Sequence, residues 1–435
     1  MSASEQSLLT LEYAEQPAET CSEVSPTAAH RWPSAPVWLW LWLGAVGAIV
    51  GMAIFLPFGW DAKDYLSALH QYSDYVNGHA SFSLAYSPLF MIPVLSAARL
   101  LPLWLAIVLF ALAYLSGWLA QVWVGMQFAT PGERKTLRCF APVIAFFPGL
   151  LVSDVIVSGN LAYILYGLML AAAAFGWKRQ RWMWFYLAVL VAACVKVQLL
   201  TMLAIPLLCG KRQFMRATLT GAAGLGLYAL QFRLWPEAFQ AYLGSLKVMS
   251  QSSRDFGCGP AGNLARVLQN LGLPYETPCI VFYAAYAIVL FLILLSLSKL
   301  YREQRVSFEN WAPVMLLGVV LLNPRILTYD VAAVSLPMAL VAWRCLRGDG
   351  PNPRTALIVG SAMALLAVNV FVELNEDWIT VLPHAWKYLE MFLMLGIFAG
   401  GVRRLLQEAQ VEWPAYISET DMVSPIPESE TASFD

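Results

Sequence analysis

The chain has 435 residues, of which 59% are hydrophobic and only 13% are charged, and its formal net charge is −1. Soluble domains carry roughly 25% charged residues, so this composition and a mean hydropathy of +0.61 are typical of a membrane protein. A chain without an excess of positive charge is not expected to bind nucleic acid. We therefore expect an all-α polytopic membrane protein.

The first uncharged segment runs from Pro33 to Trp60. A helix of about 20 apolar residues crosses the hydrocarbon core of a bilayer, so this segment is long enough to span it. It is too long for a secretory signal peptide, and no short basic stretch leads into it. Further uncharged segments cover 100–132, 139–153, 155–177, 182–195, 197–210, 217–232, 277–298, 310–324, 331–343 and 355–372. A last membrane helix is expected near 384–402.

These segments predict roughly 10 to 13 membrane segments. Several are too short to span alone, which predicts kinked or re-entrant helices that are buried in protein. Residues 33–405 are predicted to form the transmembrane domain. Residues 1–32 and 406–435 are predicted to be disordered cytoplasmic tails, because Ser, Glu, Thr and Pro dominate the ends of the chain.

Six basic clusters contain 17 of the 27 Lys and Arg residues and should mark the cytoplasmic side. One topology places all six there, if 84–125 makes one net crossing and 182–210 enters and returns as a hairpin. The alternative has two crossings in 84–125 and places two clusters outside. We favour the first topology, which leaves 59–85 and 235–276 as outer loops. The clusters are Arg134-Lys135 with Arg138, Lys178-Arg179 with Arg181, Lys211-Arg212 with Arg216, Lys299 with Arg302 and Arg305, Arg344 with Arg347 and Arg354, and Arg403-Arg404.

Asp61 is the first charged residue after the first apolar segment, so it should lie where that segment emerges into water. A carboxylate at this position could meet a lipid-borne and a water-borne substrate together. Asp64 lies three residues later, on nearly the same face of a helix. Residues 62–77 have an apolar stripe that includes Tyr65 and predict an amphipathic helix along the membrane interface. Such a helix could shape a site or could simply cover the bundle.

Lys196 has 14 uncharged residues on each side. An ionisable group at this depth costs about 3 kcal/mol on insertion scales, so it should face a cavity or a partner. At the tip of the hairpin its ammonium could hold a phosphate oxygen. It could instead form an internal pair with Asp154 or Asp330, or extend to the interface.

Other outer-side groups could also bind an anion. Arg325 follows Asn323-Pro324, and Arg254 and Arg266 lie in the outer segment 235–276. An arginine suits bidentate contact with phosphate, although Arg325 could equally form a structural pair with an Asp of another helix. Ser158-Gly159-Asn160 begins an apolar helix whose N-terminus could contribute backbone N–H groups.

Several site types have no signal in this chain. The four histidines are scattered, and no His/Cys spacing is typical of a metal site, so we expect neither a metal nor a cofactor. No Gly-rich phosphate loop and no nucleophile elbow is present. Cys258 and Cys279 both belong to the outer side, where they could form a disulfide or remain thiols.

The order of these pieces resembles glycosyltransferase family 87, the polyprenol-phosphate-mannose-dependent mannosyltransferases of the C-type superfamily. The resemblance covers roughly residues 35–345. It depends on their order: Asp61 with Tyr65, Tyr86-Ser87-Pro88-Leu89-Phe90, Ser158-Gly159-Asn160-Leu161, Val195-Lys196-Val197 and Asn323-Pro324-Arg325. The family usually has Tyr-Pro-Pro at 86–88, Gly-Gln at 159–160 and a His near Tyr329. These departures concern the sugar and the acceptor more than the fold.

The resemblance implies a C-type glycosyltransferase-like helical bundle and a glycosyltransferase of the cell membrane, a bacterial inner membrane, with its site facing outward. A hexose, mannose in the family, would pass with inversion from a polyprenyl-phosphate donor to a lipid or glycan acceptor. Asp61 would act as the base and Asp64 would position the acceptor. Lys196 and Arg325 would hold the donor phosphate. The further substrate-binding candidates are Tyr65, Tyr86, Asn160, Arg254 and Arg266.

Two other classes of protein share part of this pattern. A transporter or flippase of lipid-linked sugars would also have an intramembrane Lys and broken helices. It would more naturally show internal repeats and charges reaching both faces, and neither is evident in the sequence. A structural subunit of an envelope complex would have no pocket.

Overall fold

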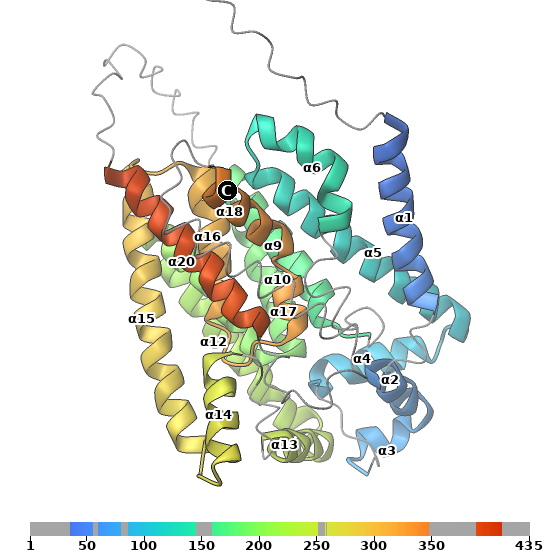
Figure 1. Cartoon of the computed structure of the whole chain (residues 1–435). Helices are drawn as coiled ribbons and strands as arrows, with labels where there is room; N and C mark the ends of the chain where they lie inside the picture. Colours follow the sequence, from blue (N-terminus) through green and yellow to red (C-terminus); the bar gives the residue numbers. More distant parts are fainter. Residues whose placement is uncertain are drawn as a thin grey trace, which may run out of the picture.

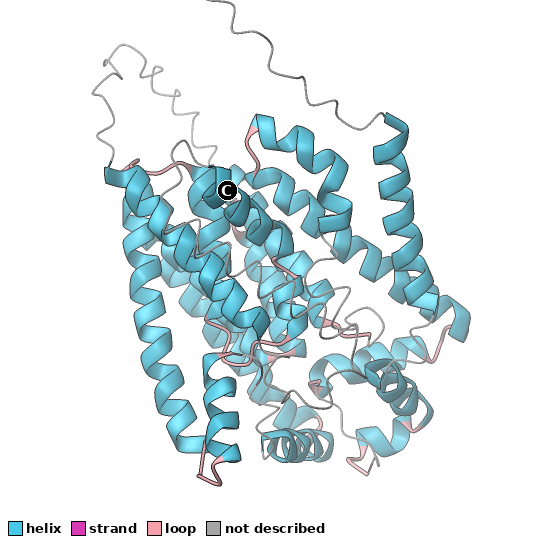
Figure 2. Ribbon diagram, viewed as in Figure 1, coloured by secondary structure: helices cyan, strands magenta, loops and turns pink. Residues whose placement is uncertain are grey.

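A computed structural model of the chain describes residues 35–54, 60–79, 86–144, 159–250, 257, 259–347 and 389–410. Every secondary-structure element in these ranges is helical, with 17 α-helices and one 3₁₀ helix (Figure 2). The elements are α1 (Ala35–Ile54), α2 (Trp60–His70), α3 (Tyr72–Val76), α4 (Pro88–Ala98), α5 (Leu103–Phe128), α6 (Pro131–Ile144), α9 (Ala162–Arg179), α10 (Met183–Val195), η2 (Val197–Leu203), α11 (Ala204–Cys209), α12 (Lys211–Leu234), α13 (Pro236–Ser250), α14 (Pro260–Asn270), α15 (Glu276–Arg302), α16 (Phe308–Leu321), α17 (Thr328–Ala332), α18 (Ser335–Arg347) and α20 (Leu389–Gln410).

Two of the described helices, α5 and α15, are long and apolar enough to cross a membrane. Only 17% of the most apolar window of each is buried within the protein, so neither resembles the core helix of a soluble domain. Both instead present large apolar side chains on the outside of the bundle, such as Trp104 and Leu112 on α5 and Ile288 and Val289 on α15. In Figure 1 the two helices lie on opposite flanks of the molecule.

The tightest packing at the centre of the bundle joins α5 and α9. Gly117 and Gly167 face each other across this contact, and a Cβ at Gly167 would lie 2.8 Å from the Gly117 carbonyl oxygen. The two backbones can approach this closely only because both positions lack a side chain. This contact sets the position of the N-terminus of α9 along the axis of α5.

The basic clusters gather at the end of the bundle where α6 lies, as hydrogen bonds between distant segments show (Figure 1). Arg344 of α18 forms a buried ion pair with Glu133 of α6 (Nη2 to Oε2, 2.6 Å) and also donates to the carbonyl of Glu309. Arg404 of α20 donates to the carbonyl of Arg344. These contacts bring two of the basic clusters beside α6, which carries a third.

Three further clusters reach the same end. Lys178, at the end of α9, donates to Gln127 near the end of α5 (2.5 Å). Arg305 donates to the carbonyl of Ala409 in the last turn of α20 (2.6 Å). The cluster that begins α12 is adjacent, because the Cys209 thiol just before it accepts from the Trp177 indole near the end of α9 (2.8 Å). The described members of all six clusters therefore lie at one end of the bundle, as the favoured topology requires, and the side of a membrane on which that end lies stays a prediction.

The predicted hairpin over 182–210 is present. Helix α10 ends at Val195, the backbone of Lys196 is extended, and η2 and α11 continue from there. Tyr186 near the start of α10 donates to the Gln213 side chain just after α11 (2.9 Å), so both ends of the hairpin meet. Lys196 therefore lies at the tip, away from the basic clusters.

Two sequence predictions need correction. The helix expected over 62–77 is broken at Gln71 into α2 and α3, because Gln71 has φ −101° and ψ 38° and interrupts the helical path. The C-terminal tail predicted from residue 406 begins too early. Helix α20 continues to Gln410, and its Glu408 accepts hydrogen bonds from the Ser307 N–H and from Asn310 (both 2.9 Å).

Some predicted features lie outside the described residues. These are the N-terminal tail, the segment 355–372 and the chain beyond 410. Among the described helices, α2, α3, α4, α13 and α14 gather at the end opposite α6 (Figure 1). This second end contains the residues that the sequence singled out.

Candidate functional site

Asp61 lies in the first turn of α2 and is held by Asn160, which comes just before α9. The Asn160 amide donates to Asp61 Oδ2 at 3.0 Å, across 99 residues of sequence. Burial raises the pKa of Asp61 to about 6, although the positive charge of Lys196 and the Asn160 hydrogen bond both favour the ionised form. A carboxyl group with this pKa changes charge close to neutral pH, as a general base requires.

Asn160 also connects Asp61 to Lys196. Its side-chain oxygen accepts from the N–H of Ala162, the first residue of α9 (3.0 Å), in the pattern of an Asx turn. The same oxygen accepts from Lys196 Nζ at 3.5 Å, and the backbone carbonyl of Asn160 accepts from the Tyr114 hydroxyl. One buried amide therefore holds the start of α9, the carboxyl of Asp61 and the ammonium of Lys196 together.

Lys196 is 7% exposed and lies at the break between α10 and η2. Its ammonium lies 4.8 Å from the centre of the Tyr86 ring, a cation–π arrangement. The Val195 carbonyl accepts a hydrogen bond from the Ser87 N–H (3.3 Å). The break between α10 and η2 thus directs the Lys196 ammonium toward Asn160 and Tyr86. It also leaves the Val195 carbonyl free of the helix to accept from the segment that carries Tyr86.

Gln231 of α12 supports this arrangement and was not identified from the sequence. It is fully buried, and its side-chain oxygen accepts from the Ser87 hydroxyl (2.6 Å) and from the Leu89 N–H (3.1 Å). These bonds satisfy two hydrogen-bond donors at the start of α4 and hold the neighbouring Tyr86 beside Lys196. A Gln in the uncharged stretch 217–232 is a signal, but its partner Ser87 lies 144 residues away in the chain, so the sequence does not identify the pair.

The Asn323-Pro324-Arg325 segment forms a turn on the same side. Asn323 accepts from the Arg325 N–H (3.0 Å) and donates to the Tyr166 hydroxyl of α9 (3.1 Å). Asp330 of α17 accepts from the Leu327 N–H (2.7 Å). The charges of Asp330, Asp61 and Arg325 all act on Lys196, so the Arg325 turn lies within electrostatic reach of the Asp61, Asn160 and Lys196 cluster.

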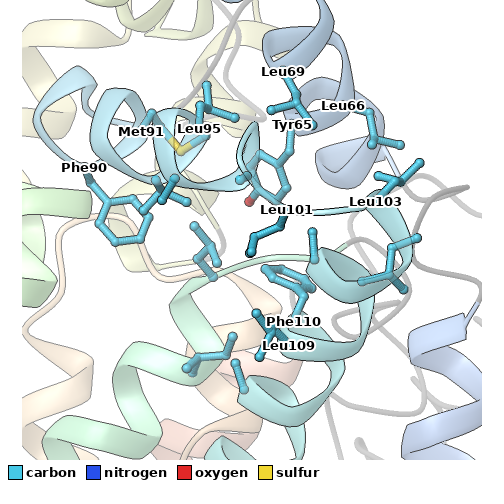
Figure 3. A pocket seen from close by; sticks show the side chains of 18 of the residues that line it. Tyr65, Leu66, Leu69, Phe90, Met91, Leu95, Leu101, Leu103, Leu109 and Phe110 are labelled. Atoms are coloured by element: carbon cyan, nitrogen blue, oxygen red, sulfur yellow. The ribbon is translucent and has the colours of Figure 1, made fainter.

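An apolar pocket of about 560 Å³ lies next to this polar cluster, between α2, α4, α5 and the start of α9. Its lining is aliphatic and aromatic, including Phe90 and Leu95 of α4 and Phe110 of α5 (Figure 3). Tyr65 points into the pocket from α2 (Figure 3), and its hydroxyl donates to the Gly159 carbonyl (3.3 Å). Since the Tyr65 ring lies 5.5 Å from that of Tyr86, the pocket begins directly beside the Lys196 site.

Of the predicted site residues, Asp61, Tyr65, Tyr86, Asn160, Lys196 and Arg325 come together here. Asp64 lies on the same face of α2 as Asp61 and interacts with it electrostatically. Arg266 lies on α14, which packs against α15, and the described interactions of Asp61, Lys196 and Asp330 do not include it. That Arg266 joins this site therefore stays a prediction.

Three other predicted groups cannot be placed, because Arg254, Asp154 and Cys258 lie outside the described residues. Cys279 is a buried free thiol. Gly257 has a φ of +80°, and a Cβ there would lie 2.5 Å from the Ile326 carbonyl oxygen. The outer segment therefore touches the backbone of the Arg325 turn at a position where only glycine fits.

Within the described part of the chain, no group of three or more His, Cys, Asp or Glu side chains is arranged to hold a metal ion. Among the described residues, the polar groups at this site include the Asp61 carboxyl, the Asn160 amide and the Lys196 ammonium. In comparisons with known proteins, no family model and no curated protein matches this sequence. Any conclusion about function therefore depends on the site itself.

Proposed function

We propose that the protein is a polytopic membrane glycosyltransferase that moves a hexose from a polyprenyl-phosphate donor to a lipid or glycan acceptor. By the family resemblance the hexose is mannose. The observation that carries the proposal is the chain of contacts from Asp61 through Asn160 to Lys196, placed directly beside an apolar pocket. A base, a phosphate-binding cation and a lipid-sized apolar pocket in one place are what this reaction requires.

A membrane location is supported by the outer surface of the bundle. Beyond α5 and α15, helix α12 also exposes large apolar side chains, among them Leu219, Leu225 and Phe232. Soluble monomers rarely expose apolar patches of this extent, whereas lipid-facing helices do so as a rule. The common position of the basic clusters supports an orientation in which they face the cytoplasm and the Asp61 cluster faces outward, in a bacterial inner membrane.

In the proposed reaction the acceptor hydroxyl oxygen attacks the anomeric carbon of the donor sugar. Asp61 takes the hydroxyl proton as the new glycosidic bond forms. The bond between the anomeric carbon and the phosphate oxygen breaks, and its electron pair leaves with the polyprenyl phosphate. Lys196 and Arg325 stabilise the negative charge that grows on that oxygen. Attack from the side opposite the leaving group inverts the anomeric configuration.

The apolar pocket supports the choice of a lipid-borne donor. Its volume lies in the range of common ligand pockets, and its lining offers a polyprenyl chain almost only carbon atoms. Several lining residues, including Val94 and Leu103, are exposed at the molecular surface, so a chain could enter from the surrounding lipid. Tyr65 and Tyr86 separate the pocket from the charged groups, where the phosphate would lie.

Transfer can be tested with purified protein, a short-chain polyprenyl-phosphate mannose and a lipid extract as the source of acceptors. We expect a mannosylated product from the wild type and none from Asp61→Asn, which keeps the shape of the side chain but cannot accept a proton. Lys196→Met should lose donor binding. Asp64→Asn is the matched control, and it should reduce activity less than Asp61→Asn.

Three outcomes would contradict the proposal. Normal turnover by Asp61→Asn would show that Asp61 is not the base. An equal loss of activity in Asp61→Asn and Asp64→Asn would mean that the two carboxyls act together. Donor binding without any product, together with transbilayer movement of the donor in vesicles, would favour the lipid-linked sugar transporter instead.

A further inference from the structure

The turn between α9 and α10 exposes two arginines together with two apolar side chains. Trp182 points inward, where its ring lies 6.0 Å from that of Trp177. Gly176 leaves room for it, since a Cβ there would lie 2.9 Å from the Trp182 ring. The residues around Trp182 face the outside instead. They are Arg179, Arg181, Met183 and Trp184, of which Met183 is 80% and Trp184 62% exposed.

The first turns of α12 bring a similar set of side chains beside α10. Tyr186 of α10 donates to the Gln213 side chain of α12 at 2.9 Å. The next residues of α12, Phe214 and Met215, are 62% and 69% exposed, and Arg216 is exposed as well. Gln213 and Arg216 are neighbours on successive turns of α12. Two packed helices therefore begin with exposed apolar groups and arginines at the same end of the bundle.

No described carboxylate forms an ion pair with any of these three arginines. Three carboxylates at this end of the bundle have other partners. Glu133 pairs with Arg344 at 2.6 Å, Glu303 pairs with Lys299 at 3.7 Å, and Glu408 accepts from a backbone N–H at 2.9 Å. The positive charge of this surface is therefore available to an anion from outside the described chain.

Arginines among exposed apolar side chains suit an amphiphilic anion better than a small soluble one. A guanidinium matches the geometry of a phosphate bidentately. A tryptophan such as Trp184 prefers the level of a bilayer where hydrocarbon meets headgroups. Basic sites between membrane helices on the cytoplasmic side are where anionic headgroups bind. The charge and the apolar character together specify a phospholipid with a net negative charge.

We propose that the seam between the starts of α10 and α12 binds one anionic phospholipid of the cytoplasmic leaflet. Arg181 and Arg216, with Arg179 beside them, hold the phosphate of its headgroup, and Trp184 and Phe214 pack against its acyl chains. This inference rests on the membrane orientation within the proposed function and not on the transfer reaction. It assigns a lipid to the end of the bundle opposite Lys196.

The test is the affinity of phosphatidylglycerol for the full-length protein in an uncharged detergent, measured by native mass spectrometry. Phosphatidylcholine of equal chain length is the neutral comparison, and it should bind at least about tenfold more weakly. Arg181→Gln and Arg216→Gln should each weaken phosphatidylglycerol binding about fivefold, which is the contribution of one basic residue near an anionic membrane surface. Arg181→Lys keeps the charge and should retain most of the affinity.

Arg233→Gln is the matched control, because Arg233 is also exposed and lies at the opposite end of α12. The two arginines of this helix are about 25 Å apart along its axis, well beyond the screening length of about 10 Å at 0.1 M salt. Arg233→Gln should therefore leave the affinity within about twofold of wild type. Inorganic phosphate at the concentration of the lipid should not displace it, since phosphate brings no acyl chain. Thermal unfolding without added lipid verifies that each variant is folded.

Equal affinity for the charged and the neutral lipid would overturn the inference, as would equal effects of Arg216→Gln and Arg233→Gln. Displacement by inorganic phosphate at equal concentration would show a simple anion site, and the proposed partner would be wrong. The two proposals fail separately. A protein that binds phosphatidylglycerol as expected but transfers no mannose keeps this inference and loses the proposed function. One that transfers mannose without a preference for the charged lipid does the reverse.

Discussion

The pH dependence of transfer offers the most direct test of Asp61 as the base. Burial places the pKa of Asp61 at about 6, and only the ionised carboxylate can accept a proton. With this pKa, about 9% of the Asp61 side chains are ionised at pH 5 and about 91% at pH 7. The transfer rate at low donor concentration should therefore fall roughly tenfold between pH 7 and pH 5.

Changes to two neighbours of Asp61 should move the midpoint in opposite directions. Asn160→Ala removes the hydrogen bond to Asp61 Oδ2, which favours the ionised form. A hydrogen bond to a charged group contributes about 1.5 kcal/mol, or about one pKa unit, so the midpoint should rise to about 7. Asp64→Asn removes a nearby negative charge that raises the pKa of Asp61, so its midpoint should fall.

The assay is kcat/KM for mannosyl transfer between pH 4.5 and pH 8.5, with each variant normalised to its own maximum. Normalisation separates the midpoint from any overall loss of rate, which matters because Asn160 also contacts Lys196. A flat wild-type profile between pH 5 and pH 7 would show that Asp61 does not control the rate. Midpoints that shift in the same direction for both variants would refute the electrostatic reasoning.

Three more predictions concern the scaffold. Arg344→Met should lower the free energy of unfolding by about 3–5 kcal/mol, because it leaves Glu133 buried without its partner. Burial raises the pKa of Glu133, but the Arg344 hydrogen bonds outweigh burial and the net shift is downward. The wild type should therefore lose this stabilisation as the pH falls through the carboxyl range, in thermal unfolding, whereas Arg344→Met should not. Gly167→Ala should destabilise by about 1–3 kcal/mol through backbone overlap, whereas Gly226→Ala, with open space around its Cβ, should be neutral or stabilising. Gln231→Leu should reduce transfer at least about tenfold and lower the free energy of unfolding by about 1–3 kcal/mol, since it leaves the Ser87 hydroxyl and the Leu89 N–H without their acceptor and releases the segment beside Lys196.

Charged residues in an apolar sequence gave the most reliable predictions. Lys196 has no other charge for 14 residues on either side, and the structure places it at the tip of a hairpin beside Asn160. Asp61 was predicted from its position after the first apolar segment, and the two residues do meet in one site. A charge in such a setting must find a partner, and few partners exist in a chain with 13% charged residues.

Other parts of the site could not be predicted, for physical reasons. The lining of the apolar pocket and the exposed apolar surface of the bundle consist of the same types of residue, so the sequence does not distinguish Phe110, in the pocket, from Leu112 on the outside. Gln231 depends on a contact with a distant segment.

The hydrogen bond from the Ser87 N–H to the Val195 carbonyl joins the apolar pocket to the Lys196 site. The chain from Tyr86 to Met91 touches the Lys196 ammonium at one end and lines the pocket at the other. A ligand in the apolar pocket would therefore contact the same segment that lies against the Lys196 ammonium. A donor with a shortened chain should lose turnover as well as affinity, and an uncharged single-chain lipid that fills the pocket should inhibit transfer without ever reaching Lys196.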